Sequence, residues 1–468
     1  MAEQPLRILQ VSTADIRGGA EKVAWNLLNA YRERGYCSWL AVGEKRSLDP
    51  NILVVPNQES RGKWYHFFRG LASRWQRSEG RVQGRVRIET PLSRLAGGLA
   101  EPVRRLEFYA GIEDFHFPGT SRLFRLIGEP PDILHAHNLH GGYFDLRLLP
   151  WLSHQVPVVL TLHDAWLLSG HCAHSFNCQK WKTGCGRCPD LTIYPDIQRD
   201  ATGYNWRRKR DIFARSRLYV ATPSRWLMQK VEQSMLAPGV LEAQVLPNGV
   251  DLKIFHPADR SAVRSKLGIP QDAWVLLAMG VLIRENIWKD YRTLREAVGR
   301  VSERLGRKKM LVIALGEDAP PERVGRAEIR FIPFQEEIES VAHYYQVADI
   351  YVHAARADTF PTGILEALAC GIPVIATDVG GISEQVDEAR TGFLVPAGDV
   401  AGLATRILQL FSNKDLQEEM GILAAGSARQ RFSLERQVDG YLAWYHRLAG
   451  GTPPTARHKN SVADTAFP

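Results

Sequence analysis

The 468-residue chain is predicted to form two α/β domains, each with a parallel sheet buried between layers of helices. Three observations carry this prediction. The chain is longer than a single hydrophobic core supports. Short apolar runs typical of buried strands alternate with amphipathic stretches typical of helices, and the alternation occurs twice. Hydrophobic residues make up 45% and charged residues 24% of the sequence, which excludes a disordered, collagen-like or coiled-coil chain.

The first predicted domain covers residues 1–240. It opens with an apolar strand over Leu6–Ser12, a turn at Gly18 and Gly19, and a helix over Glu21–Arg34. Further buried strands are expected at residues 132–136, 156–162 and 218–222. This alternation is typical of the start of a doubly wound domain.

The second predicted domain covers residues 241–430, after a turn-rich hinge at 246–257. Its strands are expected at residues 274–280, 310–315, 329–333, 350–353 and 373–377, with a helix at 291–305. A last helix is predicted at 431–449, where it can cross back to the first domain. The polar, proline-containing tail at 450–468 is predicted to be disordered.

A basic and aromatic insertion over residues 59–120 interrupts the first domain. Between Arg61 and Leu106, eleven Arg and Lys residues face three Glu residues, and this surplus of eight equals the net charge of the chain, +8. Tryptophan, tyrosine and phenylalanine lie among the arginines, and a second basic run follows at 206–210. The combination favours peripheral contact with an anionic membrane. A merely solvated surface insertion is the alternative, and no nucleic-acid-binding motif accompanies the charge.

The remaining whole-chain signals concern the cell compartment. The sequence begins without the basic start and apolar stretch of a signal peptide. Its longest apolar run, around 274–283, is half the length of a membrane-spanning helix. These features predict a cytoplasmic protein that contacts the inner face of the cell membrane through its basic insertion.

Four of the six cysteines cluster in a loop over residues 171–189: Cys172, Cys178, Cys185 and Cys188. Cys185 and Cys188 have the spacing of a zinc knuckle, and four thiolates can close a tetrahedral site. We therefore predict a structural zinc ion in this Cys-rich loop. Packed free thiols, or disulfides if the compartment allows them, are the alternatives.

The stretch from Asp358 to Pro373 carries the clearest chemical signal. A helix is expected to start at Pro361 and to end at Gly371, which places Glu366 in its second turn. The backbone N–H groups of Thr362, Gly363 and Ile364 would be free at the start of this helix, and such a helix start binds phosphate well. The pattern therefore predicts a diphosphate site.

This stretch resembles the donor-site signature of glycosyltransferase family 4. The shared features are an acid seven residues before Glu366, the following Ala-Leu-Ala-Cys-Gly-Ile-Pro-Val, and Gly-Gly-Ile-Ser-Glu at 380–384. Further shared motifs lie at 18–21, 161–164, 223–226 and 247–251, and in the basic pair Arg284 and Lys289. The resemblance covers roughly residues 5–430. It implies the GT-B fold, two Rossmann-like domains facing a cleft, and retaining transfer from a nucleotide sugar.

The resemblance also implies roles for individual residues. Asp358 would lie against the donor sugar and Glu366 would reach the nucleotide ribose. The family usually has Glu at the first position, and Asp is shorter by one C–C bond, about 1.5 Å. Arg284 and Lys289 would hold the diphosphate and stabilise charge on the leaving nucleotide. Gly18 and Gly19 would let the backbone approach the donor phosphate and the acceptor.

Histidines follow two strands of the first domain. His163 ends one strand at the position where the family often has a histidine near the reacting sugar, so the resemblance makes it a catalytic candidate. His135, His137 and Asn138 end the neighbouring strand and are candidates for the acceptor side. No Asp-x-Asp pair occurs in the sequence, so we expect no divalent metal and no other cofactor in catalysis.

The expected function is therefore sugar transfer from a nucleotide-diphosphate donor to a glycan. The basic insertion favours a lipid-linked acceptor in bacterial surface or exopolysaccharide biosynthesis. A sugar-nucleotide epimerase on the same fold, or a catalytically silent sugar-nucleotide-binding scaffold, is the alternative.

Overall fold

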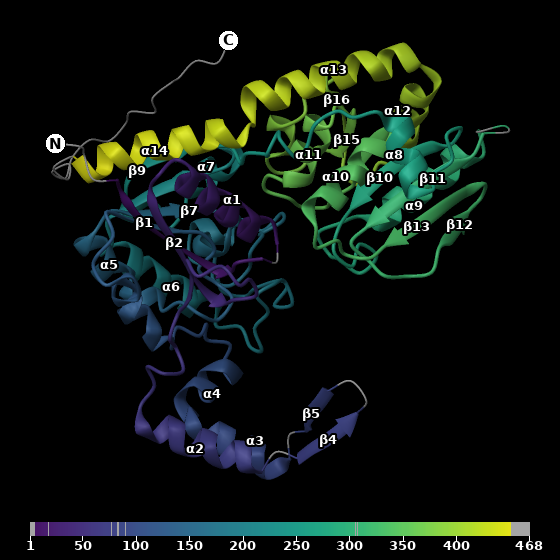
Figure 1. Cartoon of the computed structure of the whole chain (residues 1–468). Coiled ribbons are helices and arrows are strands. Elements are labelled where there is room, and N and C mark those ends of the chain that lie inside the picture. The colour runs from purple at the N-terminus through teal and green to yellow at the C-terminus, as the bar shows by residue number, and fades with distance from the viewer. Residues whose placement is uncertain are drawn as a thin grey trace.

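The computed structural model describes residues 5–450, except for residues 17, 76, 82, 83, 89, 305 and 307. Side chains within 76–89 are also outside the description, as is the predicted tail beyond Gly450. Two seven-stranded sheets with flanking helices lie side by side, which confirms the predicted α/β fold class (Figure 1).

Every strand contact in the first sheet is parallel, and the strand order is β3-β2-β1-β6-β7-β8-β9. The strands are β1 (Arg7–Ala14), β2 (Cys37–Glu44), β3 (Ile52–Val54), β6 (Ile133–Ala136), β7 (Val158–Thr161), β8 (Leu218–Thr222) and β9 (Val240–Val245). The helices around this sheet are α1 (Gly19–Glu33), α5 (Leu149–Gln155), α6 (Thr202–Phe213) and α7 (Arg225–Glu232), with short 3₁₀ helices η1 (Pro118–Ile127), η2 (Leu146–Leu148), η3 (Trp166–Leu168), η4 (Lys180–Lys182) and η5 (Ala237–Gly239). The predicted boundary at residue 240 falls at the first residue of β9, so this domain extends to Val245.

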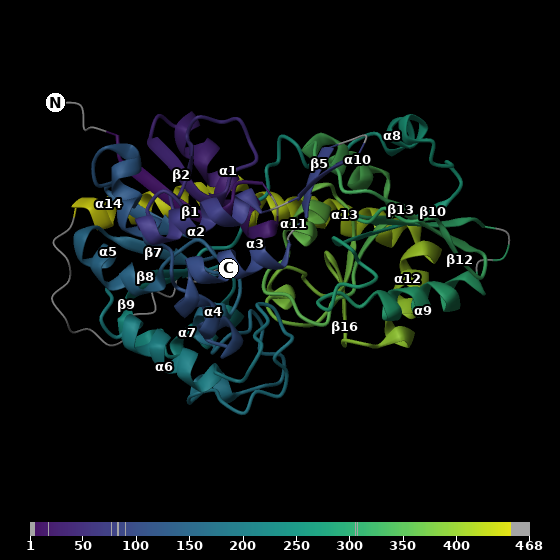
Figure 2. The same ribbon diagram turned by 90° about the horizontal axis from the view of Figure 1, so that it is seen from below.

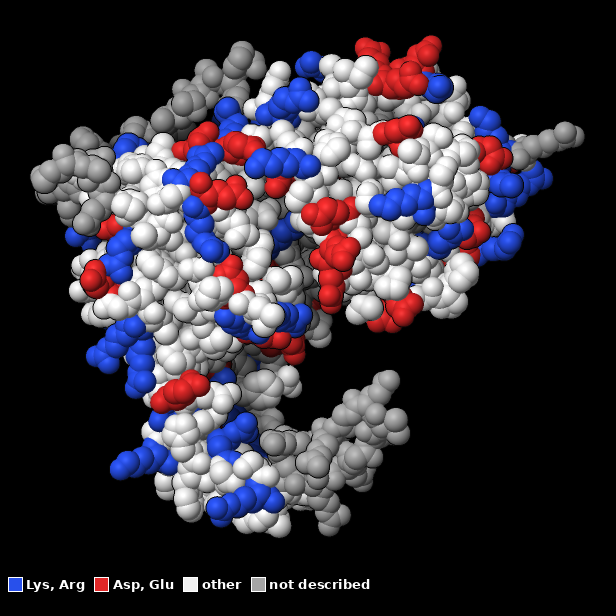
Figure 3. Space-filling model, in the orientation of Figure 1, with Lys and Arg blue, Asp and Glu red and all other residues white. Residues whose placement is uncertain are grey.

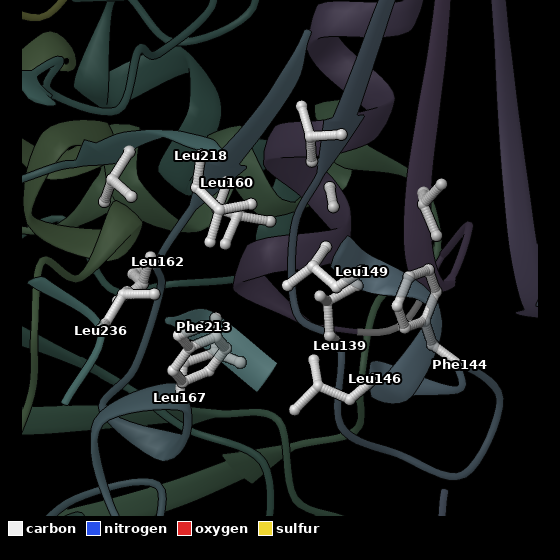
Figure 4. Close-up of a cluster of buried hydrophobic side chains, with 14 of the residues drawn as sticks. Leu139, Phe144, Leu146, Leu149, Leu160, Leu162, Leu167, Phe213, Leu218 and Leu236 are labelled. Atoms are coloured by element: carbon white, nitrogen blue, oxygen red, sulfur yellow. The ribbon is translucent and has the colours of Figure 1, made fainter. Parts of the chain in front are cut away.

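The first sheet is buried on both faces because its strands are apolar throughout. In β7, Val158 and Leu160 pack into one core with residues of α5, α6 and α7, whereas Val159 faces α1. Figure 4 shows part of this first core, where Leu160 and Leu218 of the strands lie beside each other and Phe213 of α6 lies next to Leu167. Continuous apolar runs of this kind are typical of parallel sheets covered by helices on both sides.

The second sheet has the order β12-β13-β11-β10-β14-β15-β16, and only the β12–β13 contact is antiparallel. Its strands are β10 (Trp274–Met279), β11 (Met310–Leu315), β12 (Glu322–Val324), β13 (Ala327–Ile332), β14 (Ile350–His353), β15 (Val374–Thr377) and β16 (Gly392–Val395). The helices of this domain are α8 (Arg260–Leu267), α9 (Tyr291–Ser302), α10 (Ile338–Val347), α11 (Thr362–Ala369), α12 (Val400–Ser412) and α13 (Lys414–Arg431), with 3₁₀ helix η6 (Ile382–Glu384). Helices α10 and α11 cover one face, and α9 and α12 cover the other.

The last helix, α14 (Leu434–Gly450), returns to the first domain. Figure 1 shows α13 over the second domain and α14 over the first domain. Tyr441, Trp444 and Tyr445 of α14 are fully buried against β6, β7 and α1. At the crossing, Val250 donates its N–H to Phe432 O at 2.8 Å. The C-terminal helix is therefore part of the first domain's core.

The insertion projects from the first domain at the end opposite α14 (Figure 1), and in the view from below it overlies that domain (Figure 2). It contains α2 (Lys63–Arg74), the hairpin strands β4 (Arg77–Arg81) and β5 (Gly84–Ile88), α3 (Pro91–Ala100) and α4 (Pro102–Tyr109). Within the described residues, no helix combines the length and the apolar character that crossing a bilayer requires.

The basic run at 206–210 does not form a surface patch as a whole. Lys209 is fully buried in α6, where its ammonium donates to Glu113 Oε1 at 2.8 Å and to the carbonyls of Trp166 and Ser169. Trp206 is also buried. The helical period turns these two residues to the core, so the run contributes less exposed charge than the sequence suggests.

Candidate active site

A cavity of about 1190 Å³ lies between the two domains. The first domain lines it with Gly18, Gly19, Glu21, Lys22, Asn138 and His163; the second domain contributes Gly280, Lys289, His353, Asp358, Thr362, Gly363 and Glu366. Parallel strands and the helix starts that follow them meet at this edge of each sheet, which is the usual ligand position in open α/β sheets.

Glu366 is held at the base of the cavity by α11. Its side chain is only 3% exposed, because the surrounding helix face is apolar and packs against the second sheet. One carboxylate oxygen accepts a 2.6 Å hydrogen bond from Lys22 Nζ of α1, an ion pair that joins the two domains. The other oxygen, Oε2, is buried without a partner among the described residues. Glu366 therefore keeps one free acceptor for a ligand hydroxyl.

Asp358 and Lys289 form an ion pair across the cavity wall. Lys289 Nζ donates to Asp358 Oδ2 at 3.0 Å, and His353 Nε2 lies 3.2 Å from the same oxygen. Burial opposes the charge on Asp358, but the charge of Lys289 and the contact with His353 lower the pKa of this carboxyl well below its usual value. Asp358 is therefore a carboxylate across the physiological pH range, opposite a cation that can bind phosphate.

The start of α11 offers two backbone donors rather than the predicted three. Pro361 is the N-cap residue, and Thr362 and Gly363 line the cavity. No hydrogen bond within the described residues uses the N–H of either. Ile364 is fully buried, and its N–H donates to Pro361 O at 3.3 Å, so it is not available to a ligand. The Thr362 and Gly363 amides, with the helix dipole, suit a phosphate group.

The histidines of the first domain form a buried chain that ends at the cavity. Of the predicted residues His135, His137, Asn138 and His163, the last two line the cavity. His137 lies one layer below, with Nδ1 3.1 Å from His163 Nε2 and Nε2 3.0 Å from Gln10 Oε1. His135 is fully buried between Thr161 and Tyr445, so the structure contradicts its prediction as an acceptor-side residue. Residues two apart on a strand share a face, which keeps His135 and His137 on the side covered by α14.

Two family models match this chain. Residues 89–254 match Glycosyltransferase Family 4, and residues 273–413 match Glycosyl transferases group 1. The second match contains Lys289, Asp358 and Glu366. The chain is a glycosyltransferase of the family 4 type. An epimerase finds no support in these matches.

Curated relatives are similar to this glycosyltransferase over different lengths. It is 27% identical over 359 residues to the putative colanic acid biosynthesis glycosyl transferase WcaC of Escherichia coli K12, a match covering 71% of this chain and 81% of WcaC. It is 35% identical over 222 residues to the D-inositol 3-phosphate glycosyltransferase of Geodermatophilus obscurus, covering 44% of this chain. That match spans about half of the inositol-phosphate enzyme, 47% of its length.

Solved structures share the fold of the glycosyltransferase. Anabaena Alr3699/HepE in complex with UDP and glucose has a TM-score of 0.62 and 18% identity, over 95% of this chain and all of that chain. WaaG, a glycosyltransferase involved in lipopolysaccharide biosynthesis, has a TM-score of 0.56 and 14% identity over the same shares. These likenesses support the predicted GT-B arrangement of two domains.

Arg284 does not join Lys289 at the donor side of the glycosyltransferase. Its guanidinium pairs with the buried carboxylate of Glu317 and lies over the Phe331 ring, and it is not among the residues that line the cavity. In the loop that follows β10, Leu282 has a φ of +49°, and the N–H of Arg284 donates to Glu317 Oε2 at 3.2 Å, so both the backbone and the side chain of Arg284 face Glu317. The predicted basic pair is therefore split, and only Lys289 faces the cavity.

The Cys-rich loop of the glycosyltransferase holds four free thiols. Within the described part of the chain, no three His, Cys, Asp or Glu side chains are arranged to hold a metal ion, so the residues as placed do not fit the predicted zinc site. Burial raises the pKa of the Cys185 thiol to about 12, which keeps the proton on this sulfur. Zinc in this loop stays a prediction, which metal analysis of the purified protein decides.

Three cavity contacts were missed by sequence reasoning. Lys22 follows the Gly-Gly-Ala-Glu motif directly and reaches Glu366 of the other domain. His353 ends β14 five residues before Asp358, and a histidine at a strand end close to a predicted site could have revealed it. Thr359 Oγ1 donates to the carbonyl of His163 at 2.6 Å, an interdomain contact that no local pattern signals.

Several histidines of the glycosyltransferase are buried and neutral, so its free energy of unfolding should fall in mild acid. Burial lowers the pKa of His135 to about 3 and of His163 and His353 to about 4, against about 6.5 in the unfolded chain. Between pH 6.5 and 4 the unfolded chain binds protons that the native chain does not. The free energy of unfolding is thus highest above pH 6.5 and should fall by about 1.4 kcal/mol per pH unit for each such histidine.

Urea unfolding at pH 7.0 and 5.0 measures this effect. In His135→Asn, the difference between the two pH values should shrink by about 2 kcal/mol. Equal pH dependence in the parent and the variant would show that His135 is not held neutral by burial.

Proposed function

We propose that this glycosyltransferase moves a sugar, with retention of anomeric configuration, from a nucleotide-diphosphate donor to a glycan acceptor. One observation carries the proposal: Lys289, Asp358 and Glu366 converge with the free amides of α11 in a single interdomain cavity. The HepE structure is a complex with UDP and glucose, which makes a uridine diphosphate sugar the first donor to test.

Each group has a specific task in this proposal. Lys289 and the amides of Thr362 and Gly363 bind the diphosphate and stabilise the negative charge that develops on it. Glu366 Oε2 accepts a hydrogen bond from a ribose hydroxyl, and Asp358 contacts the donor sugar. The acceptor hydroxyl attacks from the face that the diphosphate leaves, and the departing phosphate oxygen takes its proton. The donor thus serves as its own base, and His163, neutral at physiological pH, hydrogen-bonds the reacting sugar.

A nucleotide screen tests the proposal. The midpoint of thermal unfolding should rise with one of the uridine, guanosine or adenosine diphosphate sugars, because a ligand that binds only the native state stabilises it. Nucleotide should then be released only when a glycan acceptor is added. Failure of every donor at millimolar concentration would contradict the proposal, and binding without release across an acceptor panel would favour the silent scaffold.

We further propose that the acceptor is lipid-linked and that the insertion binds an anionic membrane, which places the enzyme at the inner face of the cell membrane. The exposed apolar side chains of the insertion are each 42% to 71% accessible: Trp64, Phe67, Trp75, Leu92, Leu95, Leu99, Val103, Leu106, Phe108 and Tyr109. Exposed patches of this kind mark interaction sites. The likeness to WcaC, named for colanic acid biosynthesis, favours a surface polysaccharide as the product.

The charge around this apolar surface is largely positive. Lys63, Arg69 and Arg74 of α2 are exposed, and Figure 3 shows Lys and Arg prevailing on the described part of the projecting lobe. The molecule is hollowed between this lobe and the second domain (Figure 3). A membrane under the lobe would therefore present a lipid-linked acceptor on the hollow side.

Flotation with vesicles should show a clear difference in membrane binding between two triple variants. Neutralising Lys63, Arg69 and Arg74 to Gln should reduce binding to phosphatidylcholine vesicles containing phosphatidylglycerol by about tenfold or more, at roughly 1 kcal/mol per basic residue. The matched control neutralises three exposed basic residues of the second domain, Lys266, Lys414 and Arg429, and should bind as the parent does. Equal flotation of both variants would contradict the membrane proposal.

A further inference from the structure

An aromatic contact joins the Cys-rich loop of the first domain to the donor-side loop of the second domain. The rings of Phe176 and Trp288 are nearly parallel, with an interplanar angle of 7° and centroids 5.4 Å apart. His174 meets the same indole edge-on, at 6.2 Å and 71°. Both arrangements are favourable for aromatic pairs.

In the first domain, several contacts hold the part of the Cys-rich loop that carries His174 and Phe176. His174 stacks on Trp226, with centroids 5.7 Å apart, and Lys230 Nζ lies 4.9 Å from the Trp226 ring on α7. Glu384 of the second domain accepts the N–H groups of Arg225 and Trp226 at 2.8 Å each. Phe176 itself has a φ of +44°, a conformation that non-glycine residues rarely adopt. The loop is thus fixed in an uncommon shape that presents the phenyl ring to Trp288.

In the second domain, Trp288 is bonded to the segments that carry the candidate donor groups. Its carbonyl accepts the N–H of Arg356 at 2.9 Å and of Ala357 at 3.4 Å, and Asp358 is the next residue. On the other side of Trp288, Lys289 forms a β-bridge with Ala355. The backbone of Trp288 is therefore bonded to the segment that leads to Asp358 and is continuous with Lys289.

We propose that Phe176 and Trp288 are positioning residues that hold Lys289 and Asp358 in the geometry that binds the donor. This inference rests on the proposed function, in which those two groups contact the diphosphate and the sugar. Because Phe176 belongs to the first domain, the donor site reaches its full binding geometry only when the two domains are in contact. The Cys-rich loop thereby acts on the donor side of the cavity, although it belongs to the first domain.

Calorimetric titration with a nucleoside diphosphate tests this role without an acceptor. The probe is UDP, or whichever of UDP, GDP and ADP stabilises the parent most. Phe176→Ala and Trp288→Ala should each raise its Kd about three- to tenfold, and the double variant should be no weaker than the weaker single variant, because one contact is lost in all three. Phe176→Trp, which keeps a stacking ring, should stay within about twofold of the parent.

A matched control removes an aromatic pair elsewhere. Trp151→Ala breaks the contact of α5 with Phe124, 5.8 Å between centroids, at an exposed site far from the second domain, and should leave Kd unchanged. An unchanged Kd in Phe176→Ala would overturn the inference. The inference would also be overturned if Phe176→Trp raised the Kd as much as Phe176→Ala does and also lowered the midpoint of thermal unfolding. Such a result would mean that Phe176 has a structural role only.

The same measurements separate this inference from the proposed function. A parent that transfers sugar while Phe176→Ala keeps the parent's Kd and KM for the donor contradicts the inference alone. A parent that binds UDP but transfers to no acceptor, with weakened binding in Phe176→Ala, supports the positioning role and contradicts the transfer. If the parent binds none of UDP, GDP and ADP, both are contradicted.

Discussion

Lys289→Ala is expected to lower kcat/KM for sugar transfer by about 10²- to 10³-fold, the usual cost of removing one group that stabilises charge in a transition state. Lys289 Nζ is the cavity cation closest to the Asp358 carboxylate, and both line the same wall. Because the leaving diphosphate gains charge during the reaction, the loss should fall on kcat as well as on KM. Initial rates with saturating acceptor and varied donor measure both.

The same substitution should also lower the free energy of unfolding, since it leaves a largely buried carboxylate without its cation. Lys289→Met/Asp358→Asn removes both charges and should recover most of the stability while the activity stays low. The control is Arg284→Ala. Its partner Glu317 lies outside the cavity lining, so kcat/KM should remain within about threefold of the parent. Loss of activity in Arg284→Ala alone, with Lys289→Ala active, would contradict this site assignment.

Removal of α14 is expected to prevent the first domain from folding. Val438, Tyr441, Trp444 and Tyr445 are fully buried in its core. Truncation of one buried aromatic residue to alanine costs about 3–5 kcal/mol, and a whole domain is stable by only about 5–15 kcal/mol. The hydroxyls of Tyr441 and Tyr445 also contact Thr161 and His135 at 2.7 and 2.6 Å, and their loss would leave buried polar groups without partners.

A chain ending at Ser433 should therefore be insoluble or lack the near-ultraviolet circular dichroism of the first domain. A chain ending at Gly450 keeps every described contact and is the matched control. Trp444→Ala, a milder change, should lower the free energy of unfolding by about 3–5 kcal/mol in urea titration. Parent-like cooperative unfolding of the chain ending at Ser433 would show that α14 is dispensable to the domain.

The central strands of both sheets were predicted well from the sequence because each of them is a short, continuous apolar run. Residues 218–222, 310–315 and 350–353 were placed to the residue. Strand β9 was not foreseen because none of its residues is buried: Leu241, Ala243 and Val245 are exposed, so its apolar side chains do not form a buried face. The hydrophobic periodicity of a sequence indicates which residues are buried, and it is therefore weak for a strand at the exposed edge of a sheet.

Individual site residues were predictable where a local rule governed them. Glu366 and Asp358 follow from one helix and its spacing. Arg284 and Lys289 look equivalent in sequence, but Arg284 pairs with Glu317 and Lys289 pairs with Asp358, and no local pattern signals which distant carboxylate each will meet. His135 was placed at the wrong depth because a strand end cannot be located to within one residue from its pattern.

Contacts between the domains were not predictable at all. Two of these contacts, Lys22 with Glu366 and Phe176 with Trp288, join residues more than 100 positions apart. No short sequence pattern encodes the relative placement of two domains. The resemblance to family 4 named the donor groups of the second domain, but it gave no partner for them in the first domain. Those partners became visible only with the cavity.

The most direct test of the central claim is a crystal structure of this glycosyltransferase with UDP or another stabilising nucleoside diphosphate. In that structure, the diphosphate should lie within hydrogen-bond distance of Lys289 Nζ and the amides of Thr362 and Gly363, with the ribose hydroxyls on Glu366. A nucleotide whose diphosphate binds beside Arg284, or outside the interdomain cavity, would contradict the central claim.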